Sequence, residues 1–354
     1  MTDKDNSKPL QEMVQSFIDN KKAINITAGK SKSFYGRKAT GEQLSVAEHS
    51  GIINYEPTEL VITARCGTPL SEIETVLNQH NQMLGFEPPH FTDQATLGGC
   101  IATGLSGPSR PYKGAVRDFV LGITIINGKS EILHFGGEVM KNVAGYDVSR
   151  LMVGALGTLG IVLDVSLKVL PRPEKETTLS YELTEQSAIN RINKYCGQSL
   201  PVSAACFDGD RLHIRLSGNA SGVSAARKLL GGEEETNSES LWKKIREHTH
   251  SFFQSTSPLW RCSILPASDP LSIPGKQFID WGGAQRWLIS DTEPQTIFSK
   301  INDLGGHATL FRNGDRSGDV FQPLHGKLRE LHKQVKLAFD PHGLFNPGRL
   351  YPDF

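Results

Sequence analysis

The chain has 354 residues, more than one domain usually contains, so we expect two domains. Lys+Arg and Asp+Glu balance at 38 each, so no net charge favours nucleic acid or an anionic membrane surface. The start of the sequence, Met1 to Asn6, is polar, and no apolar run reaches the roughly 20 residues of a membrane helix. We therefore expect a cytoplasmic protein whose only route to the inner face of the membrane is through a partner complex.

The cysteines argue against a metal or disulfide framework. Five are scattered along the sequence, and none forms a Cys-x-x-Cys pair: Cys66, Cys100, Cys196, Cys206 and Cys262. This spacing does not suit an iron–sulfur cluster, a structural zinc site or a set of disulfides. We expect buried thiols in a reducing compartment, and no metal site on this chain.

Strand and helix patterns alternate in the first third of the sequence. Residues 11–20 predict a short helix, and strands are expected at 23–27 and at 59–67, where β-branched residues end on a glycine. A helix follows from Pro69, and Gly85 is expected to end it. Its apolar face is formed by Leu70, Ile73 and Leu77.

A hairpin and a domain boundary are predicted next. Residues 119–133 are typical of a β-hairpin that turns at Asn127-Gly128, a pair that favours a type I′ turn. A further strand is expected at 160–170, and the proline-rich segment 171–174 ends it and marks a boundary.

The second half continues as a mixture of helices and strands. Residues 212–216 alternate as a half-buried strand does, and 221–230 predict a helix that ends at two glycines. Apolar residues recur at helical spacing near the end, over 324–339. The whole pattern predicts an α+β protein.

Three loops rich in small residues, 27–36, 96–107 and 154–160, indicate one large cofactor held at several points. Small residues let backbone N–H groups approach an anionic group closely. The alternative is that these loops are only tight turns. The sequence contains neither GxGxxG nor GxxxxGK[ST], so a nicotinamide-type Rossmann domain and a P-loop nucleotide hydrolase are not expected.

Charged candidates accompany these loops. Lys30 and Lys32 follow a predicted strand directly, and ammonium groups beside free N–H groups suit a pyrophosphate; the alternative is a solvent-exposed lysine pair. Arg261 could hold a substrate carboxylate, or it could be structural. His307 opens an apolar strand but has no second histidine at metal-ligand spacing. Arg261 and His307 are the catalytic candidates.

Five segments carry a family resemblance: the first loop with Phe34–Gly36, Pro88–Pro89, Gln94–Gly99, Gly154–Gly160 and the ending Phe339–Leu350. Together they resemble the FAD-binding domain of the vanillyl-alcohol oxidase / p-cresol methylhydroxylase (PCMH) superfamily. The resemblance implies an α+β fold with a PCMH-type, two-subdomain FAD-binding module over residues 1–172. It also implies an α+β cap domain over 173–354, with a C-terminal helix and a last segment that returns to the flavin.

The resemblance assigns FAD to particular positions. Residues 28–33 would wrap the pyrophosphate, Gly160 and Ile161 would hold the adenine end, and Asn346 would lie near the isoalloxazine edge. The implied cofactor-binding residues are Ala28, Gly29, Lys30, Ser31, Lys32, Ser33, Thr92, Thr96, Gly98, Gly99, Gly107, Gly160, Ile161 and Asn346. No histidine of the kind that carries covalent flavin in this family precedes Tyr35, so we expect FAD to be bound non-covalently.

Three further blocks, 54–65, 135–147 and 280–284, are similar to the FAD-binding subunits of multi-subunit glycolate oxidases. This implies oxidation of glycolate to glyoxylate, with electrons passed through FAD and an iron–sulfur subunit to quinone. It also implies a second FAD-binding, catalytic subunit, since only His307 falls near the family's metal-binding histidines. Two alternatives remain open: a self-sufficient FAD-dependent dehydrogenase for D-lactate or another 2-hydroxy acid, and a non-catalytic scaffold subunit.

Overall fold

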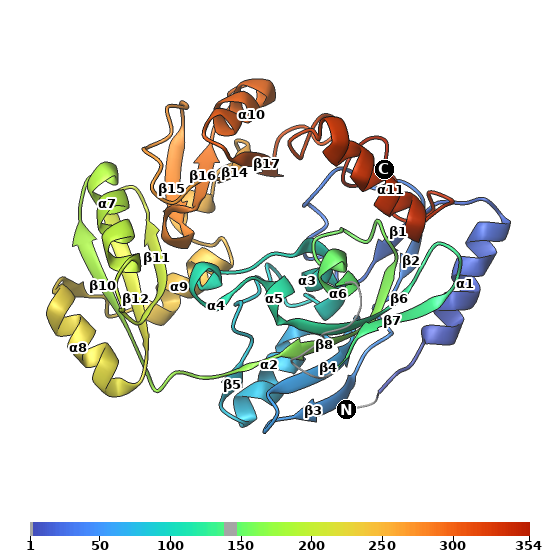
Figure 1. The fold of residues 1–354 in the computed structure, drawn as a ribbon, viewed down its shortest axis with the longest axis horizontal. Helices are drawn as coiled ribbons and strands as arrows, with labels where there is room; N and C mark the ends of the chain where they lie inside the picture. The colour runs from blue at the N-terminus through green and yellow to red at the C-terminus, as the bar shows by residue number, and fades with distance from the viewer. Residues whose placement is uncertain (1–2, 138–146) are drawn as a thin grey trace.

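The computed structural model describes residues 3–137 and 147–354, so the segment 138–146 of the similarity block at 135–147 lies outside the described residues. Figure 1 shows two groups of strands: a five-stranded sheet built from the first half of the chain, and a larger eight-stranded sheet built from the second half. The C-terminal helix lies on the side of the first group. The predicted α+β character is confirmed.

The first sheet is antiparallel and has the order β3-β4-β8-β6-β7. Its strands are β3 (Ile52–Glu56), β4 (Val61–Arg65), β6 (Val120–Ile126), β7 (Ile132–Gly136) and β8 (Ile161–Lys168). Strand β4 is buried along its whole length because a core covers it, and α2 (Leu70–Gln79) contributes Leu70, Ile73 and Leu77 to that core. Burial of these aliphatic side chains is the main force that holds the sheet and helix together.

Shorter elements surround this sheet. A parallel pair, β1 (Ile24–Thr27) and β2 (Glu42–Ser45), stands apart from it. The remaining elements of this half are α1 (Ser7–Asp19), β5 (Gln82–Met83), α3 (Leu97–Thr103), α4 (Arg110–Lys113), α5 (Val116–Phe119), α6 (Val148–Met152) and β9 (Leu170–Pro171). Strand β1 and helix α3 will form walls of the site described below.

The second sheet is also antiparallel, with the order β13-β10-β12-β11-β15-β16-β14-β17. Its strands are β10 (Lys175–Glu182), β11 (Val202–Phe207), β12 (Arg211–Gly218), β13 (Glu233–Glu234), β14 (Leu259–Ser263), β15 (Lys276–Asp280), β16 (Gln285–Ile289) and β17 (His307–Arg312). The helices of this part are α7 (Glu185–Cys196), α8 (Ala220–Leu230), α9 (Ser238–Arg246), η1 (Ser251–Phe253), η2 (Trp281–Gly283) and α10 (Pro294–Asp303). The predicted division of the chain at residues 172 and 173 stays a prediction.

The last helix, α11 (Gly326–Phe339), leads the chain back to the first sheet. Its residues Val335 and Phe339 pack against the core of that sheet. The segment after the helix then runs beside β1, where the Ile24 N–H donates to Leu344 O at 2.8 Å and the Phe345 side chain is fully buried. In the part of the chain that the structure describes, no helix is both long and apolar enough to span a membrane.

Two local predictions were wrong. Helix α2 ends at Gln79, and not at Gly85, because β5 follows it at once. The hairpin between β6 and β7 does not use an Asn-Gly type I′ turn: its loop runs over 127–131, and the residue with positive φ is Ser130 (+60°). Gly128 instead packs against Asp340, whose Oδ1 would lie 2.6 Å from a Cβ at that position.

Candidate functional site

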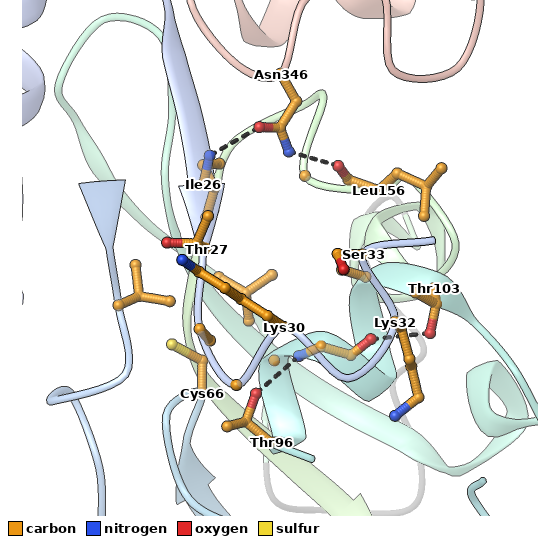
Figure 2. Close-up of a pocket in the computed structure, with 18 of the residues that line it drawn as sticks. Ile26, Thr27, Lys30, Lys32, Ser33, Cys66, Thr96, Thr103, Leu156 and Asn346 are labelled. Atoms are coloured by element: carbon orange, nitrogen blue, oxygen red, sulfur yellow. Dashed lines mark hydrogen bonds between the residues drawn. The ribbon is translucent and has the colours of Figure 1, made fainter. Parts of the chain in front are cut away.

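The predicted small-residue loops converge on one cavity, which Figure 2 shows between β1, the loop after it, α3 and the C-terminal segment. The space among its lining residues is about 1120 Å³, open solvent at its mouth included. Eleven of the sequence-predicted cofactor residues line it: Ala28, Gly29, Lys30, Ser31, Lys32, Ser33, Thr96, Gly98, Gly99, Gly160 and Asn346. Residues far apart in sequence thus line one site.

The loop that follows β1 presents a row of unused backbone donors. The N–H groups of Gly29, Lys30, Ser31 and Lys32 donate no hydrogen bond to any part of the chain that the structure describes. Lys30 adopts a left-handed conformation, with φ of +56°. Successive N–H groups in such a turn form a concave anion site, so this loop can hold a phosphate group.

The two lysines of this loop have different surroundings. The Lys30 ammonium is exposed and donates to Gln43 Oε1 at 3.1 Å. Lys32 is only 5% exposed, and burial lowers the pKa of its ammonium, an effect that Cys100 and Glu247 oppose. In Figure 2 the Lys32 amine is directed away from the middle of the cavity, so its charge acts from behind the loop.

Helix α3 approaches the cavity with its small residues, while its first N–H groups are already used. The Gly98 N–H donates to Cys66 O at 2.7 Å, and the Gly99 N–H donates to Thr96 Oγ1 at 3.3 Å. A Cβ at Gly98 would lie 2.8 Å from Cys66 Cβ, so packing requires glycine there. A Cβ at Gly99 would meet only Thr96 Oγ1, at 3.4 Å, among the described atoms. Gly99 therefore leaves space in the cavity.

Asn346 joins three segments of the cavity wall. Its Oδ1 accepts from the Ile26 N–H at 2.8 Å, and its Nδ2 donates to Leu156 O at 2.7 Å (Figure 2). Its own N–H donates to Ile24 O at 2.8 Å. The residue has a φ of +43° and is 5% exposed. Since both ends of the amide are used by the protein, Asn346 fixes the shape of the cavity.

Five of the sequence-predicted residues do not line this cavity. Thr92 is exposed, and Ile161 is buried in the core beside Ile126. Gly107 and Arg261 line a second, smaller hollow. His307 is exposed at the start of β17, the edge strand of the large sheet.

Sequence reasoning missed several lining residues. Arg349 donates to the carbonyl oxygens of Ser33 and Tyr35, at 2.9 and 2.6 Å, and so ties the C-terminal segment to the first loop. Burial lowers the pKa of its guanidinium. Its place in the predicted C-terminal signature was the only sequence signal for it. The other lining residues that the sequence did not indicate are Asn25, Ile26, Gln43, Val46 and Cys66. The predicted loops also contribute lining residues that were not named singly as cofactor-binding: Thr27, Ala102, Thr103, Leu156 and Gly157. Val162, expected to cover a flat ring, lines the cavity as well.

The described residues contain no group of three or more His, Cys, Asp or Glu side chains placed to hold a metal ion. Four of the five cysteines are buried and all five are free thiols.

Comparisons with known proteins agree with this geometry. The family of FAD binding domains matches residues 5–136. The chain is 49% identical over 349 residues to "Glycolate oxidase subunit GlcE" of Escherichia coli (strain K12), which covers 99% of this chain and 98% of that protein. It is 40% identical over 133 residues to "Glycolate oxidase subunit GlcD" of Bacillus subtilis (strain 168), covering 36% of this chain and 28% of that protein.

The fold has a solved counterpart. A structure of p-cresol methylhydroxylase with substrate bound superposes with a TM-score of 0.74 at 14% sequence identity, covering 98% of this chain and 87% of the other. At this identity the match establishes the PCMH-type fold alone.

Proposed function

We infer the function from the family, since this chain belongs to the family of glycolate oxidase GlcE subunits. We propose that it is the FAD-carrying subunit of an enzyme complex that oxidises glycolate to glyoxylate. When bound, FAD supplies the acceptor for the two electrons removed from the substrate. The chain itself binds and orients that cofactor. Of the named relatives, the GlcE subunit alone matches over the full chain.

The observation that carries this proposal is the row of free N–H groups at Gly29–Lys32 on the wall of the main cavity. Such a row can bind the phosphate groups of a pyrophosphate, and the buried Lys32 ammonium adds a positive field behind it. The space left by Gly99 lets a flat or extended group approach α3 closely.

Several features favour non-covalent attachment of FAD. The described residues that line the cavity include no histidine, and Cys66 is their only cysteine. Burial raises the pKa of the Cys66 thiol, which keeps it in its unreactive, protonated form. We therefore assign FAD to the main cavity as a dissociable cofactor.

The proposal includes two partners. A second FAD-binding subunit would oxidise the substrate together with this chain, as the local similarity to a GlcD subunit suggests. An iron–sulfur subunit would carry electrons onward to quinone, because this chain's cysteines are scattered along the sequence, without a cluster motif. We place the complex in the cytoplasm, at the inner face of the membrane.

The cofactor assignment is tested by Gly99→Leu. A leucine side chain at this position would fill part of the cavity. It would not weaken helix α3, because glycine lowers the stability of a helix by about 1 kcal/mol relative to a good helix former. We expect the purified variant to fold and to lose at least nine tenths of its bound FAD, measured by absorbance at the flavin bands. Gly318→Leu is the matched control, because a Cβ there meets only Asp315 Oδ2, at 3.9 Å. Equal FAD content in wild type and Gly99→Leu would refute the cavity assignment.

The role within the complex is tested by anaerobic addition of glycolate to the FAD-loaded chain. We expect the flavin to stay oxidised until the GlcD-type partner is added, and then to bleach. Bleaching of the chain alone would support a self-sufficient dehydrogenase for 2-hydroxy acids. A colourless chain that still binds its partners, even after FAD is supplied, would support the scaffold alternative.

A further inference from the structure

One face of helix α11 is apolar along its length but is only partly covered by the chain. Leu328, Leu331, Val335 and Phe339 follow the spacing of a single helical stripe. Val335 and Phe339 pack against the core of the first sheet. Leu328 and Leu331 continue the same stripe, yet they are 52% and 55% exposed. The first half of the helix therefore leaves in solvent the face that its second half covers.

A hollow continues this exposed stripe, and we call it the α11 hollow. It is lined by α11, by α6 and the loop after it, and by the C-terminal residues, and the space among its lining residues is about 910 Å³, open solvent included. Leu331 lines it from α11, and Leu151, also exposed, lines it from α6. The rings of Tyr351 and Phe354 line it too, with their centroids 5.2 Å apart. Single exposed leucines are ordinary, but leucines that meet around one largely apolar hollow are typical of a surface that binds another protein.

The α11 hollow shares parts of its wall with the main cavity. In the loop after α6, residues 154–155 line the hollow, and residues 156–157 line the cavity. In the C-terminal segment, Arg349 lines the cavity, and residues 350–351 line the hollow. A protein bound in the hollow would therefore contact segments that also line the proposed FAD site.

The charges along this part of α11 favour an acidic partner. Arg329 and Lys333 share one carboxylate among the described residues, that of Asp353, at 2.6 and 2.7 Å. In the described part of the chain, Lys327, which helical spacing places beside the apolar stripe, forms no ion pair. Glu330 is the one acidic residue of α11, and the same spacing places it away from the stripe. An excess of positive charge beside an apolar stripe favours a surface whose apolar residues are flanked by carboxylates.

We propose that Leu328, Leu331 and the α11 hollow form the docking surface for the iron–sulfur subunit of the complex, which binds there through an apolar segment flanked by acidic residues. The inference rests on the proposed function, which supplies that subunit as the partner that carries electrons onward from this chain's FAD. Electron transfer weakens steeply with distance, so this partner has to dock close to the cofactor. The shared walls of the α11 hollow and the main cavity meet that requirement.

The test measures binding of the purified iron–sulfur subunit to the immobilised, FAD-loaded chain. We expect Leu331→Glu to weaken this binding at least tenfold, with FAD content and binding of the GlcD-type subunit unchanged. Leu331→Lys should weaken it less than Leu331→Glu, because an acidic partner repels a glutamate and attracts a lysine. Leu229→Glu is the matched control, since it places the same side chain at an exposed leucine of α8, on the far sheet. Glutamate and lysine are good helix formers, so these variants should fold.

Several results would overturn the inference. One is equal affinity for the iron–sulfur subunit in Leu331→Glu and wild type, and another is an equal loss in Leu229→Glu. If Leu331→Glu instead loses the GlcD-type subunit, self-association of the chain, or sedimentation with anionic phospholipid vesicles, then the face belongs to that other occupant.

Failure of this inference is distinct from failure of the proposed function. A wild-type chain that holds FAD but binds no iron–sulfur subunit refutes the proposed partner itself. A wild-type chain that binds this subunit no better than Leu331→Glu does refutes only the docking surface. Retained FAD in Leu331→Glu shows that the variant is folded.

Discussion

Single residues that line the main cavity and the second hollow adopt conformations that a sequence pattern does not reveal. Lys30, Trp281 and Asn346 have φ values of +56°, +52° and +43°, a region that favours glycine. The glycines were visible in the sequence, and they correctly indicated where the loops lie. Which side chain would be left-handed, and which glycine faces empty space as Gly99 does, depends on contacts between distant segments.

Asp280 gives a prediction at this scale. It is 5% exposed, and burial raises the pKa of its carboxyl group to about 7. Between about pH 4 and pH 7 the folded chain holds a proton there that the unfolded chain has released, so stability falls as pH rises through this range. The loss amounts to at most about 4 kcal/mol for a shift of this size.

We expect Asp280→Asn to remove this dependence while it keeps the acceptor for the Trp281 N–H. The measurement is urea unfolding of both proteins at pH 5 and at pH 8. The variant should be more stable relative to wild type at pH 8 than at pH 5. An identical difference at both pH values would contradict the assignment of the titration to Asp280.

At the scale of elements, helix α11 is joined to the cavity segment by a buried ion pair. The Lys336 Nζ donates to Asp340 Oδ2 at 2.6 Å, and also to the carbonyl oxygens of Thr158 and Phe345. Asp340 in turn accepts from the N–H groups of Leu344 and Phe345. Burial lowers the pKa of the Lys336 ammonium, whereas the carboxylate of Asp340 opposes that shift. This network sets how the chain leaves α11.

Lys336→Met should therefore destabilise the protein by about 3–5 kcal/mol, since it leaves the Asp340 charge buried and unpaired. Lys333→Met, one turn earlier on the same helix, removes a half-exposed lysine that pairs with Asp353 and should cost about 1 kcal/mol or less. Chemical denaturation of the two variants measures the contrast. An equal loss of unfolding free energy in both variants would mean that the buried Lys336–Asp340 pair stabilises the protein no more than the exposed Lys333–Asp353 pair.

The same segment explains why the predicted turn at Asn127-Gly128 was wrong. The Gly128 N–H donates to Phe339 O at 2.8 Å, and Asn127 Oδ1 accepts from the N–H groups of Lys129 and Glu131. The end of α11 therefore selects a longer loop than the local Asn-Gly pair favours. Helices with clear periodicity, such as α8 and α11, were predicted closely because their own residues determine them.

On the scale of the whole molecule, the main cavity is made of segments that only the completed fold brings together. Ile26 and Asn346 share a hydrogen bond across 320 positions, and Arg349 reaches back to Ser33 and Tyr35. The sequence could indicate that the small-residue loops bind something. It could not indicate Arg349 or Cys66 as neighbours of those loops, since nothing local relates them.

FAD binding should protect these segments together. We expect FAD to slow amide hydrogen exchange at Gly29–Lys32 most, since their N–H groups gain partners, and to slow it around Leu156 and Asn346 as well. Exchange in α8, on the far sheet, is the internal control and should not change. Mass spectrometry of peptides with and without FAD gives the comparison. Protection confined to the second hollow would contradict the assignment of FAD to the main cavity.

The bond between Ile26 and Asn346 also has a consequence for biosynthesis. During translation Ile26 emerges from the ribosome 320 residues before Asn346 does. The anion site formed by the N–H groups of Gly29–Lys32 can form before then. The part of the cavity wall formed by Asn346 and Arg349 cannot. A complete cofactor site therefore forms only after the segment around Asn346 has been translated and has bonded to β1.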